Sequence, residues 1–430
     1  MNRRWLLVDT LHDGTGAAPR HDVGVGIEDD RILAVRDAAE VRRTGGGDRV
    51  EHLPGTTLVP GMIDAHVHLL FTSGSDHTLT RRTFERGDDA TLADIGATNA
   101  AEAVLGGVTT VRDCGDTRGI VASLRDRQRR GVIPGPRILT AGAPITTTTG
   151  HLNWCGNVVT SDEELVAAVH RLADSGVDLV KLMTSGGNMT SESDPLGSQF
   201  SDEQVALAVR TAHGRGLRVA AHAQNVDSIA AAVRGGVDTI EHCLWRDSTG
   251  ALAPPEQLVE LLAGTRSVPV VTFAGLQRAL TDDAGVELSS EQRATVQASS
   301  PTGRIDHDFA WARDLLTTGS PLVVASDAGV RFTPFRTFLS SLRCAMAALG
   351  LTAGQAVATA TSHAAAALGL TEVGTVRAGM TADLTLLHGA SPDRLGSVVS
   401  VIQSGRTTVR DGLLVPGTPP PPGTDTAPDR

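Results

Sequence analysis

Short apolar runs and longer stretches with helical spacing alternate along most of this chain. Apolar runs of strand length occur at MIDAHV, TTVRD, RILTAG, DLVKLM, LRVAAH, DTIEH, VPVVTF and PLVVAS. Between most of them lie alanine-rich stretches, and two of these, SDEELVAAVHRLADSG and SDEQVALAVRTAHGRG, open with Ser-Asp-Glu and close on glycine, as helices do. The alternation predicts the α/β class, with a (β/α)8 TIM barrel over residues 59–369.

A doubly wound sheet is the competing fold for such an alternation. It would normally show a glycine-rich turn after the first strand, and neither a GxGxxG nor a Walker sequence follows the first run. The barrel is therefore the favoured prediction.

Both ends of the chain have a different pattern, made of short strands and turns. Residues 1–58 contain WLLVDT, VGVGIED, RILAVRD and TTLVP without a helix-length amphipathic stretch, and residues 370–415 resume the same style. We expect the two ends to pair into one small β-sandwich domain. Residues 416–430 are proline-rich with nothing to bury, which predicts a disordered tail.

Composition narrows the classes of partner and compartment. The 430 residues are 40% apolar and carry a formal charge of -11 without a long basic run, which argues against nucleic acid and anionic membranes as partners. The four cysteines lack CxxC spacing, which argues against a disulfide framework and fits a reducing cytoplasm. The first apolar run stops at Asp9, too early for a signal peptide core or a membrane span. We expect a cytoplasmic protein with a small-molecule partner, and the sequence leaves open whether it forms a homo-oligomer.

Polar residues stand at the carboxyl ends of five of the predicted strands. In a barrel these ends converge on one mouth, where catalytic residues lie. The residues are His66 and His68 after the first run, Lys181 in the fourth, His222 in the fifth, His242 in the sixth and Asp327 in the eighth.

Each of these residues alone has an ordinary structural interpretation. A single histidine at a strand end is usually a hydrogen-bonded polar residue, and Asp327 alone could cap the following helix. Lys181 is harder to explain, because a buried lysine must lose its charge or find a partner. Together the residues predict a metal site.

The residue types indicate which metals would bind and how many. Imidazole and carboxylate ligands without thiolates suit zinc, with manganese, cobalt and iron as alternatives. Four histidines and one aspartate exceed the needs of a single catalytic zinc. Two ions would use them all if a bridging ligand were present, and a lysine carboxylated by carbon dioxide offers two anionic oxygens for that purpose.

The ordered set of motifs resembles the metal-dependent amidohydrolase superfamily over nearly the full length, excluding the tail. The motifs are PGMIDAHVHL, GVTTVRD, KLMTSGG, AHAQN, IEHC, ASDAG, TATSHAAAALGL and GTVRAGMTADLTLL. More narrowly, the chain is similar to the branch that contains Xaa-Arg/Xaa-Lys and Xaa-Pro dipeptidases, ochratoxin amidase-like enzymes and imidazolonepropionase-like proteins.

The resemblance implies a role for each matching position. His66, His68 and Asp327 would bind a buried metal ion, and His222 and His242 would bind an exposed one, both most simply Zn2+. The carboxylated lysine of the fourth run would bridge them. The implied reaction is hydrolysis of the C–N bond of a small N-acyl amino acid, dipeptide or cyclic amide by a metal-bridging hydroxide, with Asp327 as general base and then acid.

Two other functions compete with this interpretation. A mononuclear deaminase of a heterocyclic amine usually carries glutamate three residues after the fifth-strand histidine, where this chain has Asn225, and has no need for Lys181. A metal-binding protein without catalysis would have lost ligands, whereas Lys181 and Asp327 are retained.

The sequence offers several candidates for contacts with the substrate, and most of them also have an ordinary structural interpretation. His151, in TTTTGHLNWCG, could assist the substrate carbonyl in a chain without tyrosine, or could stabilise its loop. Arg246 and Arg331 could pair with a substrate carboxylate or form surface ion pairs. Gln224 replaces a second histidine often seen in dipeptidase relatives, so a dipeptidase is not singled out. Asp113 is expected to anchor neighbouring loops.

Overall fold

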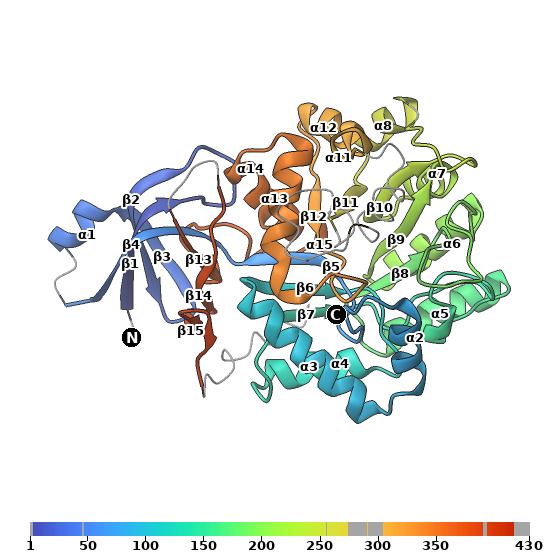
Figure 1. Cartoon of the computed structure of the whole chain (residues 1–430), viewed down its shortest axis with the longest axis horizontal. Helices are drawn as coiled ribbons and strands as arrows, with labels where there is room; N and C mark the ends of the chain where they lie inside the picture. The colour runs from blue at the N-terminus through green and yellow to red at the C-terminus, as the bar shows by residue number, and fades with distance from the viewer. Residues whose placement is uncertain are drawn as a thin grey trace.

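The computed structural model describes residues 3–44, 47–254, 256–273, 290, 304–389 and 394–416. A large sheet lies on one side of the molecule and a helix-covered set of parallel strands on the other (Figure 1). Residues 417–430 of the predicted tail lie outside the described residues.

The parallel strands form two sheets whose members follow the chain in order. One sheet has the order β5-β6-β7 and the other β12-β11-β10-β9-β8. The strands are β5 Met62–Val67, β6 Val108–Asp113, β7 Arg137–Thr140, β8 Leu179–Met183, β9 Arg218–Asn225, β10 Thr239–Arg246, β11 Val268–Thr272 and β12 Val323–Ala325. All eight predicted runs are confirmed as strands, and the arrangement is TIM-barrel-like.

Isolated parallel bridges join the two sheets at both seams. At one seam Val67 of β5 pairs with Ala328 after β12, and the N–H of His68 donates to Ala328 O at 2.8 Å. At the other seam Ile145, after β7, pairs with Leu182 of β8. The first seam brings His66, near the end of β5, and His68, just after it, next to the end of β12.

Helices alternate with the parallel strands and cover them. They are α2 His77–Arg86, α3 Asp89–Leu105, α4 Ile120–Arg129, η1 Asn153–Cys155, α5 Asp162–Asp174, α6 Asp202–His213, α7 Val226–Gly235, α8 Glu256–Ala263, α11 Ile305–Asp308, α12 Ala310–Thr317, η2 Phe335–Thr337, α13 Phe338–Leu349, α14 Ala353–Thr359 and α15 Ser362–Leu368. The two Ser-Asp-Glu starts are confirmed, because Ser161 accepts from the N–H of Glu164 and Ser201 forms a capping box with Gln204.

No single helix in the described part of the chain has the length and apolarity to cross a membrane. One bent pair, Phe335–Leu349 with Ala353–Leu368, meets the length and composition criteria only when both arms are joined across a 119° bend.

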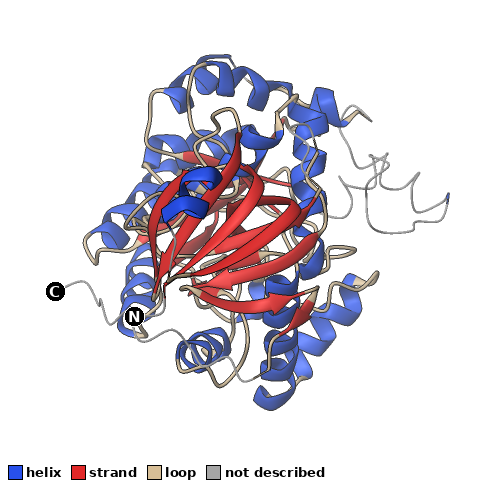
Figure 2. Cartoon of the chain, turned by 90° about the vertical axis from the view of Figure 1, so that its left-hand side faces the viewer, coloured by secondary structure: helices blue, strands red, loops and turns tan. Residues whose placement is uncertain are grey.

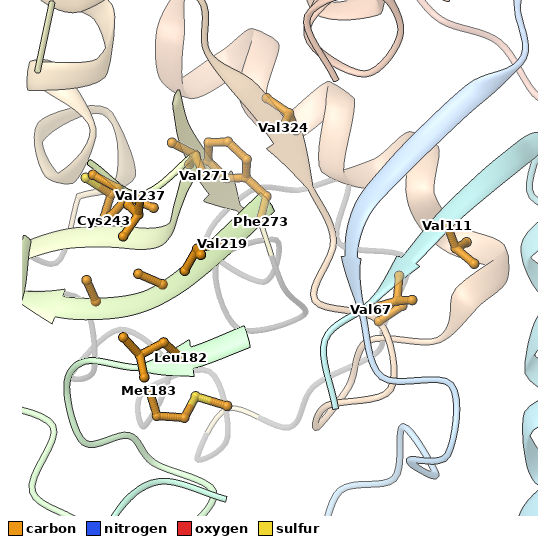
Figure 3. Packing of buried hydrophobic residues seen from close by; sticks show 14 of the residues in the cluster. Val67, Val111, Leu182, Met183, Val219, Val237, Cys243, Val271, Phe273 and Val324 are labelled. Carbon is orange, nitrogen blue, oxygen red and sulfur yellow. The ribbon is translucent and has the colours of Figure 1, made fainter. Parts of the chain in front are cut away.

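Side chains of the parallel strands alternate between the helices and the inside of the strand layer. Val67 lies between His66 and His68, and Leu182 follows Lys181; both apolar residues belong to the main hydrophobic cluster (Figure 3). Because neighbours in a strand face opposite ways, packing of Val67 and Leu182 turns the three polar side chains to the other face.

The other large sheet is built from strands of both ends of the chain. Its order is β16-β15-β14-β13-β4-β1-β2-β3, and Figure 2 shows it facing the viewer with the helices around it. The elements are β1 Arg3–Leu11, β2 Arg20–Glu28, β3 Arg31–Asp37, α1 Ala38–Thr44, β4 Arg49–Pro60, β13 Leu384–His388, β14 Val398–Gln403, β15 Arg406–Arg410 and β16 Leu413–Leu414. All eight strands are hydrogen-bonded into one sheet, so the two-layer sandwich stays a prediction.

One element of this part was missed in the sequence. Helix α1 interrupts the strands at Ala38–Thr44, where no helix was expected. It has seven residues, too few to show an amphipathic period, and only Ala38 and Val41 are buried, packing with Trp5 and Leu7.

Asp383 joins the large sheet to the parallel strands. Its carboxylate accepts from Arg137 Nη1 of β7 at 3.0 Å and from the N–H of Ser404 at 2.7 Å, and its carbonyl accepts from the N–H of Gly61 at 2.7 Å. Asp383 is only 5% exposed, so this ion pair is shielded from water on one side.

Candidate metal centre and active site

The structure places all of the sequence-proposed site residues around one cavity. The cavity has a volume of about 130 Å³ and opens at the carboxyl ends of the parallel strands. Its lining includes His66, His68, His151, Lys181, His222, His242, Arg246, Asp327 and Arg331.

Three of the expected ligands form a tight group at the seam between β5 and β12. Nε2 of His66 lies 3.5 Å from Oδ1 of Asp327, and Nε2 of His68 lies 3.4 Å from the same oxygen. The ligand atoms of His66, His68 and Asp327 all lie within 4.8 Å of one another, a grouping that could hold a metal ion.

A second group of metal-binding residue types, formed by His66, Cys114 and Glu241, is less suited to an ion. Burial raises the pKa of the Cys114 thiol to about 12, so the sulfur is protonated at neutral pH. Glu241 is already occupied by an arginine, as described next.

A buried ion pair orients His66. Nδ1 of His66 donates to Oε2 of Glu241 at 2.6 Å, which leaves Nε2 facing Asp327. Oε1 of Glu241 accepts from Nη2 of Arg112 at 2.7 Å and from the hydroxyl of Thr239 at 2.6 Å. Burial is the largest influence and opposes ionisation of Glu241, but the charge of Arg112, the hydrogen bond with His66 and further nearby charges together outweigh it, so the pKa of Glu241 lies below its usual range. A carboxylate behind the histidine fixes its tautomer, as in many metal sites.

The two histidines of β9 and β10 are held in the same way. Nε2 of His222 donates to the carbonyl of Gly186 at 2.9 Å, which leaves its Nδ1 as the lone-pair nitrogen. Nδ1 of His242 hydrogen-bonds the hydroxyl of Thr272 at 2.8 Å, which leaves Nε2 free. The rings of His222 and His242 are 4.6 Å apart between centroids. Each therefore keeps one ring nitrogen for a ligand.

Burial keeps the imidazoles neutral. It lowers the pKa of His66 to about 3 and that of His242 to about 4, and it holds the pKa values of His222 and His151 well below the usual range. Neutral imidazole is the form that binds metal ions.

Lys181 is the most unusual side chain in the cavity. It is 0% exposed, and its Nζ has no hydrogen-bond partner among the described residues. Burial lowers its pKa, which favours the neutral amine. It is also the single lysine of the 430-residue sequence, since every other basic side chain of the Lys/Arg class is arginine.

Several buried polar atoms of the cavity lack partners in the described part of the chain. The atoms without a hydrogen-bond partner among the described residues include Nδ1 of His68, Nδ1 of His151 and Oε1 of Gln224, in addition to the lysine amine. Oδ1 of Asp327 also has no hydrogen bond to a described residue and only the longer contacts with His66 and His68 given above. Unsatisfied buried polar atoms are costly, so this cluster requires ligands that complete it. The nitrogen and oxygen donors fit a zinc-type divalent ion.

The backbone is strained at two of these positions. Asp327 has φ +59° and His242 has φ +68°, and Cys243 and Trp245 beside it also have positive φ. Such conformations persist where surrounding structure enforces them, often at functional sites.

Two sequence interpretations near the site can be compared with their contacts. Asp113 accepts from the N–H groups of Leu69 at 2.7 Å and Gly115 at 3.0 Å, which confirms it as a loop anchor. Asn225 is the N-cap of α7, accepting from Ser228, and is absent from the described cavity lining. It therefore does not take the place of a catalytic glutamate.

Sequence analysis missed Arg112, Glu241, Thr272 and His77, all of which lie in or behind the site. Arg112 and Glu241 stand inside quoted strand motifs, VRD and IEH. A charged residue at an interior strand position is itself a signal, because burial demands a partner.

Residues 57–413 match the Amidohydrolase family, so the chain belongs to that family of hydrolases. Among relatives, ochratoxinase of Aspergillus niger is 26% identical over 77% of this chain and 70% of its own length. Imidazolonepropionase of Cereibacter sphaeroides is 25% identical over 91% of this chain and 94% of its own length. A crystal structure of a Xaa-Pro dipeptidase has a TM-score of 0.78 at 23% identity, covering 94% of this chain and 99% of that one, which supports the TIM-barrel-like fold.

Proposed function

We propose that this protein hydrolyses the amide C–N bond of a small N-acyl amino acid, dipeptide or cyclic amide with two divalent metal ions, preferably Zn2+. Support comes from the family membership, from relatives named for the hydrolysis of such bonds, and from the donor set of the cavity. One proposed site consists of His66, His68 and Asp327, and the other of His222 and His242.

The observation that carries the proposal is the buried, unpartnered amine of Lys181. An amine held neutral can add carbon dioxide, and the resulting carbamate has two oxygens to link two ions. Without such a modification the amine has no described partner at the centre of the cavity, which would cost stability. We infer that Lys181 is carboxylated.

Different residues of the cavity are proposed to carry out different steps of the reaction. Bound divalent ions supply Lewis acidity and lower the pKa of an attacking water. Asp327, at the cavity face of the seam, would accept the proton of the nucleophile and pass it to the departing nitrogen. His151, whose ring lies 4.5 Å from that of His222, would hydrogen-bond the substrate carbonyl. Arg246 and Arg331 are the proposed contacts for charged substrate groups.

The same proposal covers the cellular compartment, the division into domains and the partner of the protein. The described cysteines Cys114, Cys155, Cys243 and Cys344 are free and buried, which fits a reducing cytoplasm. We assign residues 59–369 to the catalytic barrel and residues 1–58 with 370–415 to the smaller domain. The partner is a small amide substrate.

The presence of one lysine makes the test direct. Protein grown with 13C-labelled bicarbonate should give one carbamate carbon resonance and about two zinc ions per chain. Lys181→Ala should lose the resonance and most of the metal. Lys181→Arg, which keeps a long basic side chain but cannot form this carbamate, should behave like the alanine variant.

One metal ion per chain in wild type and variants alike would overturn the bridging role of Lys181. The mononuclear deaminase would then become the better hypothesis, and heterocyclic amines would be the substrates to screen. Its weakness is the position of Asn225, which caps a helix rather than facing the cavity.

A further inference from the structure

Beside Asp327 the cavity is lined by two nitrogen-rich side chains from different loops, His77 and Arg331. His77 is the first residue of α2, which follows β5, and Arg331 lies after β12. Both are partly buried, and neither belongs to the proposed ligand set.

Backbone hydrogen bonds hold these two loops together. The N–H of Ser73 donates to Gly329 O at 2.9 Å, and the N–H of Phe332 donates to Gly74 O at 3.4 Å. Gly329 has φ +101°, and a Cβ there would collide with the carbonyl of His68. The positions of His77 and Arg331 are therefore fixed by the same seam that fixes the metal-binding residues.

The guanidinium of Arg331 brings a positive charge to this part of the cavity, next to Asp327. Asp327 is the one acidic residue in the described lining, and Arg331 forms no ion pair with a described acidic residue. Nε of Arg331 and Nδ1 of His77 are buried without a hydrogen-bond partner in the part of the chain that the structure describes. Burial and then the charge of Arg331 lower the pKa of His77 to about 4, so His77 offers a neutral N–H beside a guanidinium.

Arg246, the other arginine of the lining, has a different environment. Burial lowers the pKa of the Arg246 guanidinium, and the negative charge of Asp308 acts against that shift. An incoming anion would compete there with an existing carboxylate. At Arg331 an anion would meet a cation that no described carboxylate pairs with.

We propose that His77 and Arg331 bind a carboxylate on the amine half of the substrate, which makes the substrate an N-acyl amino acid or a dipeptide rather than an uncharged cyclic amide. The assignment to the amine half rests on the proposed function, in which Asp327 protonates the departing nitrogen. The N–H of Val330 donates to Asp327 O at 3.3 Å, and Arg331 follows directly. Because Arg331 and Asp327 line the same cavity, we place the carboxylate on the carbon next to that nitrogen against Arg331, whose guanidinium is suited to bind a carboxylate.

The test uses ligands that cannot be hydrolysed. N-methylsulfonyl-L-leucine carries a sulfonamide in place of the amide, and N-methylsulfonyl-L-leucinol is its uncharged partner. Dissociation constants of both would be measured by calorimetry on zinc-loaded wild type and variants. We expect the acid to bind wild type about tenfold more tightly than the alcohol, as a charged hydrogen bond gives.

Arg331→Gln should weaken binding of the acid about tenfold and leave the alcohol unchanged, and His77→Gln should do the same to a smaller extent. Arg336→Gln is the matched control, because Arg336 is exposed, about 4.0 Å from Glu102, and is not among the described lining residues. It should bind both ligands as wild type does.

Equal affinity for acid and alcohol in wild type would overturn the proposal. So would an acid preference that survives Arg331→Gln, since the carboxylate would then be bound by the metal ions. Binding is measured without turnover, so the result stands apart from the proposed function. A failure of that function would appear as absence of amide hydrolysis in a substrate screen, with the acid preference still measurable.

Discussion

At the scale of single residues, the cavity depends on a few buried charged side chains whose contacts with one another offset the free-energy cost of removing them from water. Glu241 is 0% exposed and is stabilised only because Arg112, Thr239 and His66 all contact it. Removing its charge would leave Arg112 as a buried cation without its partner and would free the ring of His66 to turn.

We therefore expect Glu241→Gln to lower zinc affinity by about 10- to 100-fold and stability by about 3 kcal/mol. Chelator competition would measure the first and urea unfolding the second. Glu40→Gln is a matched control, because the Glu40 side chain is 42% exposed and pairs with Arg36 four residues away, an interaction worth a few tenths of a kcal/mol. Unchanged zinc affinity in Glu241→Gln would mean that His66 is oriented by packing alone.

Asp327 is the residue that we expect to matter most for the reaction itself. Asp327→Asn keeps the shape but cannot shuttle a proton, so kcat should fall by about 10² to 10⁴. Metal content must be measured on the same preparation, since the carboxylate is also a proposed ligand. A variant with full metal content and nearly wild-type kcat would remove Asp327 from the proton path.

The cavity residues that could be predicted from the sequence are those in which a metal-binding or ionisable residue type stands at a strand end or inside an apolar run. Two histidines one residue apart at a strand end, and a lysine inside an apolar run, are recognisable in the sequence alone. His77 is not, because it starts a helix nine residues beyond His68 and reaches the cavity only through the loop contacts at Gly329.

At the scale of elements, the seam between β5 and β12 positions both halves of the site. Asp64 of β5 accepts from the N–H of Ser326 at 3.0 Å and from its hydroxyl, while the backbone of His66 and Asp327 is joined at 3.0 Å. The seam therefore controls the spacing of the proposed ligands, and a clash in it should lower activity as well as stability.

Gly329→Ala tests this. Its backbone conformation disfavours a side chain, and the Cβ would also press on His68, so we expect a loss of about 2–4 kcal/mol and at least tenfold in kcat/KM. Gly319→Ala is the control, because Gly319 has φ +79° with nothing within 4 Å and should cost only about 1 kcal/mol. Equal effects of the two changes on activity would show that the collision at the seam is unimportant.

Elements with strong local signals were predictable, and those decided by pairing were not. Helices α5 and α6 follow from their capping residues, and the parallel strands follow from short apolar runs of strand length. The first half of β4 was missed because RVEHLPG is polar and contains proline and glycine, and it becomes a strand by pairing with β1 from Arg49 to Leu53.

At the scale of the whole molecule, the link at Asp383 is the contact whose loss we expect to loosen the large sheet from the parallel strands. Asp383→Asn should lower the free energy of unfolding by about 1–3 kcal/mol, since Arg137 would lose its carboxylate while staying partly solvated. Urea unfolding would measure it, with zinc content unchanged. A loss of zinc with unaltered stability would contradict this structural role.

The strand β4 is shared by segments from opposite ends of the chain, pairing in parallel with β1 on one side and antiparallel with β13 on the other. During synthesis β1 and β4 are both made early, whereas β13 is made only after all of the parallel strands β5 to β12. One edge of β4 must therefore wait unpaired, and an unpaired edge invites association with other chains. Closure of that edge follows all of the parallel strands in the order of synthesis. A chain interrupted just before Leu384 would therefore carry every proposed ligand together with an exposed strand edge that promotes aggregation.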